Sequence, residues 1–239
     1  MTAPGTPSRD SRVAMISGAN RGIGAAIAER LAADGWRLSL GVRDPAKLSG
    51  RLPAEVLVQK FDARSGTDEA DWVDATVACY GRIDAVVNNA GIMIPKSVIA
   101  VSDDEIEAML EVNVKSPLRL VRAAYPELAR SGRGRVVTLA SLSGKRVKTA
   151  DSGSYAVSKF AALALAHAIR HAGWDDGVRS AAICPGYVAT DMAIDLTDVD
   201  PASMTQPADI ARIVALLLEL PNTASVPEIA VNCAVDGNF

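Results

Sequence analysis

The sequence predicts an α/β protein with a doubly wound parallel sheet of about seven strands and helices on both faces. Short apolar runs typical of buried parallel strands alternate with segments of helical periodicity between residues 13 and 232. The apolar content is 49%, whereas aromatic residues make up 4%, so aliphatic side chains must fill the core. A glycine-rich turn joins the first apolar run to the first helical segment, as such folds require.

The expected strands cover residues 13–17, 38–42, 56–59, 83–88, 134–140, 178–183 and 228–231. Helices are expected after the glycine turn and over residues 67–80, 102–128, 154–171 and 207–218. Ser102 followed by Glu105 is a capping-box pattern, and Ser154 is the expected cap of its helix. Residues 191–204 lack a strong pattern and are predicted to form a lid.

Composition and charge exclude several classes of protein. The net charge is −3 without a basic stripe, which argues against a nucleic-acid partner. No apolar run approaches the ~20 residues of a membrane span. The three cysteines are scattered, which is typical of reduced intracellular thiols. We therefore expect a cytoplasmic protein with a flexible tail over residues 1–11 and a single domain over residues 12–239.

The glycine turn contains the residues Gly18-Ala19-Asn20-Arg21-Gly22-Ile23-Gly24. Glycines let a backbone approach a pyrophosphate closely, and the following helix offers free N–H groups. The spacing is GxxxGxG rather than the commoner GxGxxG. The turn therefore predicts a dinucleotide-binding loop, and the alternative is a tight turn without a ligand.

The end of the second strand bears on the choice of cofactor. An acidic residue at this position suits a free ribose 2′-hydroxyl, whereas an arginine suits a 2′-phosphate. Arg43 directly follows the apolar run, and Arg21 lies in the glycine turn. These two guanidiniums favour NADP(H), and Asp44 is the argument for NAD(H).

Tyr155 and Lys159 lie four residues apart, so they share one face of a helix. An ammonium near a phenol is expected to lower the pKa of the phenol. A tyrosine in this state can exchange a proton with a carbonyl or alcohol oxygen. The pattern is weak alone, because many helices carry it by chance. His167 and His171 also share a face, but two histidines without a carboxylate beside them do not make a metal site, and no metal is expected.

Several motifs, in this order, resemble the short-chain dehydrogenase/reductase family of small single-domain type, whose fold is Rossmann-like. Residues 17–24 resemble its TGxxxGIG loop with Ser17 in place of Thr, and residues 88–91 match its NNAG motif. The resemblance implies a catalytic tetrad of Asn113, Ser141, Tyr155 and Lys159. It also implies that the cofactor contacts Gly18, Asn20, Arg21, Gly22, Ile23, Gly24, Arg43, Asp62, Asn89, Ala90, Gly91, Tyr155, Lys159, Pro185, Gly186, Val188 and Thr190.

The resemblance further implies hydride transfer between a nicotinamide and a carbonyl or secondary alcohol, with Tyr155 as general acid and base. Lys159 would lower the Tyr155 pKa and bind the nicotinamide ribose, Ser141 would position the substrate oxygen, and Asn113 would hold a water. Members of the family usually pair through the helices that here carry Asn113 and Tyr155, so a homodimer or homotetramer is expected.

Two departures leave the substrate open. The segment between Ser141 and Tyr155 looks one residue longer than usual and is unusually charged, and the end of the chain is only loosely similar. One alternative is a 3-oxoacyl thioester reductase that receives an acidic acyl carrier protein on a basic surface. The candidates for that surface are Arg119, Arg122, Arg130, Arg133 and Arg135. Another is a non-catalytic protein that senses NADP(H).

Overall fold

The computed structural model describes residues 11–48, 52–53 and 55–235. The predicted tail over residues 1–11 therefore lies almost wholly outside the described residues. No helix in the described part is long and apolar enough to cross a bilayer.

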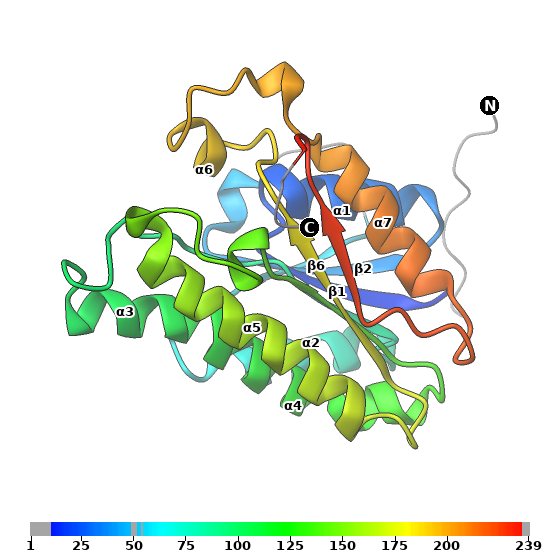
Figure 1. The fold of residues 1–239 in the computed structure, drawn as a ribbon. Helices are drawn as coiled ribbons and strands as arrows, with labels where there is room; N and C mark the ends of the chain where they lie inside the picture. Colours follow the sequence, from blue (N-terminus) through cyan, green and yellow to red (C-terminus); the bar gives the residue numbers. More distant parts are fainter. Residues whose placement is uncertain (1–10, 49–51, 54, 236–239) are drawn as a thin grey trace.

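Seven parallel strands form one sheet at the centre of the molecule (Figure 1). The sheet order is β3-β2-β1-β4-β5-β6-β7, so the chain first builds one half of the sheet and then returns to the other side of β1. This reversal lies between β1 and β4, where open sheets of this kind bind ligands at the carboxyl ends of the strands. The strands are β1 (Val13–Ser17), β2 (Arg37–Val42), β3 (Leu57–Lys60), β4 (Ala85–Asn88), β5 (Arg135–Leu139), β6 (Arg179–Pro185) and β7 (Glu228–Val231).

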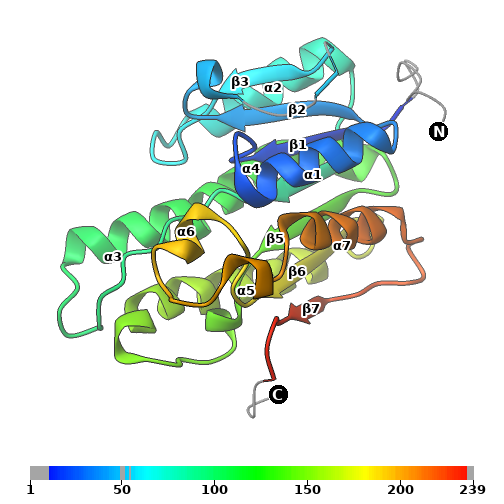
Figure 2. The ribbon, with the colours of Figure 1, turned by 90° about the horizontal axis from the view of Figure 1, so that it is seen from above.

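Helices cover both faces of the sheet. One face carries α1 (Gly22–Ala33) and α7 (Pro207–Glu219), which pack against each other above the strands (Figure 2). The other face carries α2 (Asp68–Tyr80), α4 (Ser116–Arg130) and α5 (Gly153–Ala172). The helix α3 (Asp103–Leu110) leads into α4 through the π-helical turn η2 (Glu111–Lys115), and α6 (Asp191–Ile194) is a single short turn.

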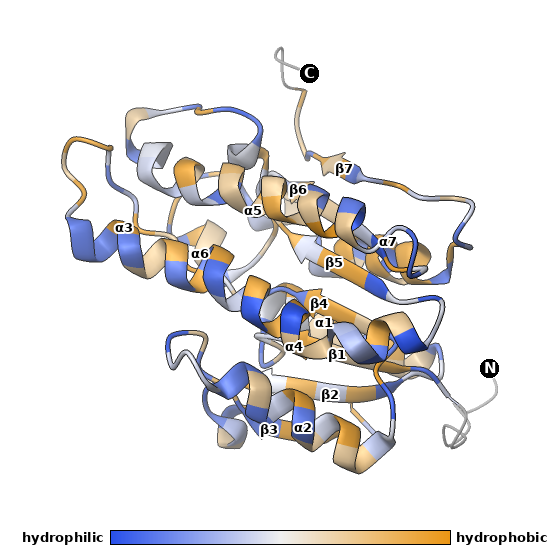
Figure 3. Cartoon of the chain, turned by 90° about the horizontal axis from the view of Figure 1, so that it is seen from below, coloured by the Kyte–Doolittle hydropathy of each residue, from blue (hydrophilic) through white to orange (hydrophobic). Residues whose placement is uncertain are grey.

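The core has two layers because successive residues of a strand point to opposite faces. Ala14 and Ile16 of β1 belong to the cluster under α1 and α7, whereas Met15 belongs to the cluster under α2, α4 and α5. Figure 3 shows this distribution: the central strands are mainly apolar, and the helices carry both apolar and polar residues. Burial on both faces explains why the strands appear in the sequence as continuous apolar runs.

The predicted elements agree with the structure to within two residues at the strand ends. The capping box of Ser102 and Glu105 is confirmed. The predicted cap at Ser154 is wrong, because α5 already begins at Gly153 and the Ser154 side chain lies inside the helix. Its hydroxyl instead donates to the carbonyls of Lys96 and Ile94, at 2.6 and 3.3 Å. Ser154 therefore fastens the loop after β4 to α5.

Candidate active site

A cavity of about 1070 Å³ opens at the carboxyl ends of the strands. Its walls are the glycine turn, the loops after β2, β3, β4, β5 and β6, the segment around α6 and residues 232–235. All of the predicted site residues line it except Gly24 and Asn113. The residues that the sequence analysis selected come from segments far apart in the chain, and nearly all of them line this one cavity.

The glycine turn leaves the amino end of α1 open toward the cavity. Gly18 and Gly22 have φ angles of 67° and 55°, in the left-handed region that favours glycine. The N-cap residue Arg21 makes no side-chain hydrogen bond to the helix, and the first turn contains no acidic residue. Free backbone N–H groups at a helix start form a ready site for a phosphate. Gly24 has a packing role, since a Cβ there would lie 2.3 Å from the Gly18 oxygen.

Ser17 and Asn89 hold the loop after β4 against the glycine turn. The Ser17 hydroxyl accepts from the backbone N–H groups of Asn89 and Ala90, both at 3.0 Å. The Asn89 amide donates to the carbonyls of Ser17 and Gly18, at 2.9 and 3.1 Å. These four bonds satisfy the buried polar groups of two loops at once, so they fix this part of the cavity floor.

Arg43 and Asp62 line the cavity on the side of β2 and β3. Asp44 does not line it, because its carboxylate accepts from the Ala46 N–H and lies 3.4 Å from the Lys47 ammonium. Arg21 lines the cavity, and its Nη1 lies 2.6 Å from Asp191 at the start of α6. Of the two charged residues that follow β2, Arg43 therefore lines the cavity and Asp44 does not.

Tyr155 and Lys159, one turn apart on α5, form a buried wall of the cavity. Burial raises the pKa of the Tyr155 phenol to about 12, and its hydrogen bond with Ser141 opposes that rise. Burial lowers the pKa of the Lys159 ammonium to about 8. The expected lowering of the Tyr155 pKa by Lys159 is absent from this structure. The Lys159 Nζ donates to the Leu139 carbonyl at 2.8 Å and lies 5.7 Å from the centre of the Tyr155 ring, so desolvation dominates.

Asn113 lies beneath this wall, in the π-helical turn η2. Its side chain accepts from the Ile92 N–H and donates to the Ile92 carbonyl and the Ser158 hydroxyl, all at 2.9 Å. Pro117 has no N–H for the α-helical bond to the Asn113 carbonyl, which explains the local widening of the helix. The Ser158 hydroxyl donates in turn to the Tyr155 carbonyl at 2.8 Å. Asn113 thus supports the wall through a relay that the sequence analysis did not foresee.

The loop after β6 closes the opposite side. Gly186 donates its N–H to the Val231 carbonyl at 2.8 Å, and a Cβ on Gly186 would lie 2.6 Å from the Asn232 amide oxygen. Thr190 comes close to the glycine turn, since a Cβ on Gly22 would lie 3.1 Å from its methyl group. Pro185 and Val188 also line the cavity. The sequence analysis missed the contribution of residues 232–235, which follow the last strand without any motif.

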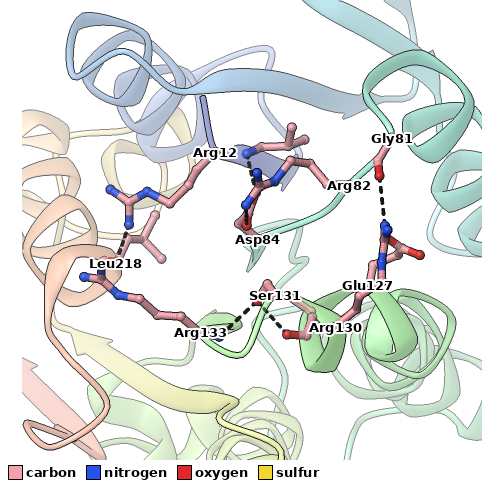
Figure 4. Close-up of polar contacts among 11 residues, drawn as sticks. Arg12, Gly81, Arg82, Asp84, Glu127, Arg130, Ser131, Arg133 and Leu218 are labelled. Atoms are coloured by element: carbon pink, nitrogen blue, oxygen red, sulfur yellow. Dashed lines mark hydrogen bonds and ion pairs between the residues drawn. The ribbon is translucent and has the colours of Figure 1, made fainter. Parts of the chain in front are cut away.

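Three of the five arginines considered as a basic docking surface lie away from the cavity. Arg130 ends α4, Arg133 lies in the turn that follows it, and Arg135 begins β5, at the amino edge of the sheet; Figure 4 shows Arg130 and Arg133. These three arginines donate to the carbonyls of Gly81, Glu219 and Leu220, respectively. Arg119 pairs with Glu69 and Glu111, and none of the five lines the cavity. Arg130, Arg133 and Arg135 therefore do not form the expected basic surface at the cavity mouth, whereas Arg119 also bonds the carbonyl of the cavity-lining Ala63 at 3.2 Å.

Arginine side chains at this edge instead donate hydrogen bonds to the carbonyls at the carboxyl ends of helices. Arg12, Arg133 and Arg135 donate to three successive carbonyls at the end of α7, and Arg12 is drawn in this position in Figure 4. The last carbonyls of a helix have no partner within it, and cations are favoured there. Asp84 joins the amino ends of two strands, because it accepts from the Val13 N–H and from Arg82.

Comparison with known proteins identifies the family. The family model for short chain dehydrogenases matches residues 12–200, and the chain belongs to this family of oxidoreductases. Two agropine synthesis reductases of Rhizobium rhizogenes are 40% and 39% identical over 227 residues, which are 93% of this chain and 53% of each relative. The chain thus spans about half the length of these relatives. An uncharacterised oxidoreductase of Staphylococcus saprophyticus is 32% identical over 92% of this chain and 96% of that protein.

Solved structures confirm the fold. An alcohol dehydrogenase of Thermococcus sibiricus complexed with 5-hydroxy-NADP has a TM-score of 0.84 at 30% identity, covering 94% of this chain and 97% of that one. A short chain dehydrogenase of Burkholderia cenocepacia in complex with NADP has a TM-score of 0.84 at 27% identity, covering 95% and 98%. The predicted Rossmann-like sheet of about seven strands is confirmed.

Proposed function

We propose that the protein is an NADP(H)-dependent oxidoreductase that interconverts a carbonyl compound and a secondary alcohol, with Tyr155 as general acid and base. The observation that carries this proposal is the meeting of Ser141, Tyr155 and Lys159 on one wall of a cavity whose other end has an open helix start. The similar structures from Thermococcus sibiricus and Burkholderia cenocepacia contain NADP or a derivative of it.

The cavity suits a dinucleotide with a 2′-phosphate. The uncapped start of α1 fits the pyrophosphate, and Arg43 fits the 2′-phosphate. Arg21 would join Arg43 by giving up its ion pair with Asp191. Asp44 is engaged with the Ala46 N–H and Lys47, so the acidic alternative that would favour NAD(H) is not directed into the cavity. When bound in this cavity, NADPH would supply hydride for reduction of the carbonyl carbon of the substrate.

Tyr155 holds the proton that reduction of a carbonyl requires. A phenol with a pKa near 12 keeps its proton at neutral pH, so it is ready to donate that proton to the oxygen of the substrate as the carbonyl is reduced. Ser141, which bonds the phenol, holds the same oxygen in position. Lys159 has three ammonium donors; one bonds the Leu139 carbonyl, and the others can reach toward Tyr155 and the nicotinamide ribose.

Asn113 takes part through its backbone. Its side chain is committed to Ile92 and Ser158, so the water-holding role falls to the carbonyl that Pro117 cannot bond in the α-helical pattern. A water on this carbonyl would resupply protons to Lys159. In this arrangement the π-helical turn is the structural reason why Asn113 can act on the site from inside a helix.

Replacing Tyr155 by Phe tests the catalytic role. We expect loss of NADPH-dependent carbonyl reduction by about a hundredfold or more, with the thermal shift induced by NADPH retained. Tyr125→Phe is the matched control, because it also removes a tyrosine hydroxyl. The Tyr125 hydroxyl lies on α4, bonds Asp176 and does not line the cavity, so this variant should keep its activity. A sensor without turnover would show no loss of its regulatory effect in the Tyr155 variant, and retained reductase activity would overturn the proposal.

Replacing Arg43 by Ala tests the choice of cofactor. Loss of a charged hydrogen bond worth about 1.5–3 kcal/mol should raise the Kd for NADPH by roughly 10–100-fold and leave the Kd for NADH within about twofold. Arg30→Ala is the matched control, since Arg30 pairs with Asp34 on the outside of α1. Equal weakening of both cofactors would contradict the assignment of Arg43.

We also propose that the protein forms a homodimer or homotetramer through α4 and α5. Leu118 on α4 and Val157 and Phe160 on α5 are exposed, with 36%, 47% and 44% of their surfaces accessible. Light scattering on the eluting protein measures the mass directly, and Phe160→Glu should shift a dimer or tetramer toward smaller species. A monomeric wild type would contradict this part of the proposal.

A further inference from the structure

The lid loop, residues 191–204, leaves and rejoins the body of the molecule at one narrow neck. Val188 and Thr205 form a parallel bridge there, and the Thr205 N–H donates to the Tyr187 carbonyl at 3.2 Å. The Ala189 N–H donates in turn to the Thr205 carbonyl at 2.9 Å. In Figure 1 the segment that carries α6 stands above the first turns of α5. The two ends of the lid loop are therefore joined to each other, and the residues between them form a closed loop.

One ion pair connects the lid loop to the glycine turn. The Arg21 Nη1 lies 2.6 Å from the Asp191 carboxylate. In the part of the chain that the structure describes, the other hydrogen bonds of residues 191–204 join the loop to itself, to Thr190 or to Gln206. Asp191 and further residues of the loop line the cavity. The Arg21–Asp191 pair therefore fastens one wall of the cavity to the turn that suits the phosphates of the cofactor.

This ion pair can be broken at little cost by a stronger anion. The side chains of Arg21 and Asp191 are 65% and 69% exposed, and an ion pair in water shifts an equilibrium by about fivefold at most. Arg21 lines the same cavity as Arg43, which suits the 2′-phosphate. A phosphate brings about two negative charges and three acceptor oxygens, whereas Asp191 brings a single charge. A 2′-phosphate bound by Arg43 is therefore a better partner for Arg21 than Asp191 is.

We propose that Asp191 competes with the 2′-phosphate of NADP(H) for Arg21, so that binding of NADP(H), but not of NAD(H), detaches the lid loop from the glycine turn. This inference rests on the proposed function, because it needs the cofactor in this cavity. When Arg21 turns to the phosphate, the Asp191 carboxylate is left beside a like charge, which favours movement of the loop away from the turn. NAD(H) has no 2′-phosphate and leaves the pair intact. The cofactor that carries this group would therefore loosen the loop before a carbonyl substrate enters the cavity.

Calorimetric titration of the full chain tests the competition. Asp191→Asn should lower the Kd for NADPH by about two- to fivefold and leave the Kd for NADH within about 1.5-fold. Asp198→Asn is the matched control, since it removes the same charge from an exposed position of the lid loop that does not line the cavity. In an Arg21→Met background, Asp191→Asn should change the Kd for NADPH by less than about 1.5-fold, because the competition needs Arg21. Equal changes for both cofactors, or equal effects of Asp191→Asn and Asp198→Asn, would contradict the proposal.

Hydrogen exchange measures the release of the lid loop itself. The probes are adenosine 2′,5′-bisphosphate and adenosine monophosphate, because neither has a nicotinamide that could touch the loop. The bisphosphate should raise the exchange rate of amides in residues 191–204 by about two- to fivefold, and the monophosphate should not. Asp191→Asn should show the raised rate without any probe. Where the bisphosphate gives no thermal shift, the same comparison is made between NADPH and NADH.

The possible results separate this proposal from the proposed function. If NADPH gives a thermal shift but the ligands with and without a 2′-phosphate affect the exchange of the lid loop equally, the competition is overturned while the oxidoreductase function stands. The same holds if Asp191→Asn leaves the exchange unchanged. If NADPH gives no thermal shift at all, both proposals fail.

Discussion

Lys159→Met should remove a pH dependence of stability that we expect in the wild-type protein. Burial lowers the pKa of Lys159 from the ordinary 10.5 to about 8, so the folded chain releases this proton before the unfolded chain does. At pH values between these two, the unfolded state binds more protons, and stability rises with pH. The destabilisation by the buried ammonium is complete below pH 8 and disappears as the pH rises through 10.5.

The structure sets the magnitude of this effect. The difference between 10.5 and about 8 corresponds to about 3 kcal/mol at neutral pH. About 2 kcal/mol of this is recovered between pH 7 and 9.5. The variant also loses the hydrogen bond from Lys159 to the Leu139 carbonyl. Because Met lacks this bond at every pH, the loss shifts the whole curve of stability against pH by a constant amount and does not change its slope. Tyr155, whose pKa is raised to about 12, lowers stability only above pH 10, outside this window.

Urea unfolding followed by tryptophan fluorescence provides the assay, because Trp36 and Trp72 are buried. We expect the free energy of unfolding of the wild type to rise by about 2 kcal/mol relative to Lys159→Met from pH 7 to 9.5. Lys47→Met, which removes a lysine that is 76% exposed at its side chain, should give a curve parallel to the wild type. A parallel curve for Lys159→Met would refute the reasoning from burial.

Two further predictions concern the sheet. Gly41→Val should lower the free energy of unfolding by about 1–3 kcal/mol, because a Cβ there would lie 2.6 Å from the Trp72 ring; an unchanged urea midpoint would contradict it. Asp84→Ala should cost about 1.5–3 kcal/mol, since Asp84 accepts from the Val13 N–H at 2.8 Å and forms two bonds with Arg82; thermal denaturation at neutral pH measures this, and the absence of a loss would mean that water replaces the carboxylate.

The order of elements could be predicted because it depends on local pattern. A strand buried on both faces is a continuous apolar run, as in residues 13–17. The glycine turn could be located for the same reason, since Gly18 and Gly22 need a backbone that other residues rarely adopt. Most of the candidate site followed, because side chains at the carboxyl ends of parallel strands meet at one edge.

Properties that depend on three-dimensional surroundings were not accessible in this way. The sequence places Lys159 one turn from Tyr155, but it does not reveal that both are buried and that Lys159 bonds Leu139. Arg135 was misjudged although the sequence already places it at the amino end of the expected strand over residues 134–140, opposite the carboxyl edge that holds the site. The Ser154 hydroxyl has a local alternative as a helix cap, and only the fold shows that the distant Lys96 carbonyl is its partner.

The sheet order has a consequence for how the chain can assemble during synthesis. After β1, the strands β2 and β3 add in turn on one side, and β4 to β7 then add in turn on the other. No strand has to insert between two that are already paired, so a chain that emerges amino end first can extend its sheet outward. Until the next strand arrives, the open edge passes from β4 to β5 and then to β6, and a stalled chain would present that edge to its neighbours for pairing.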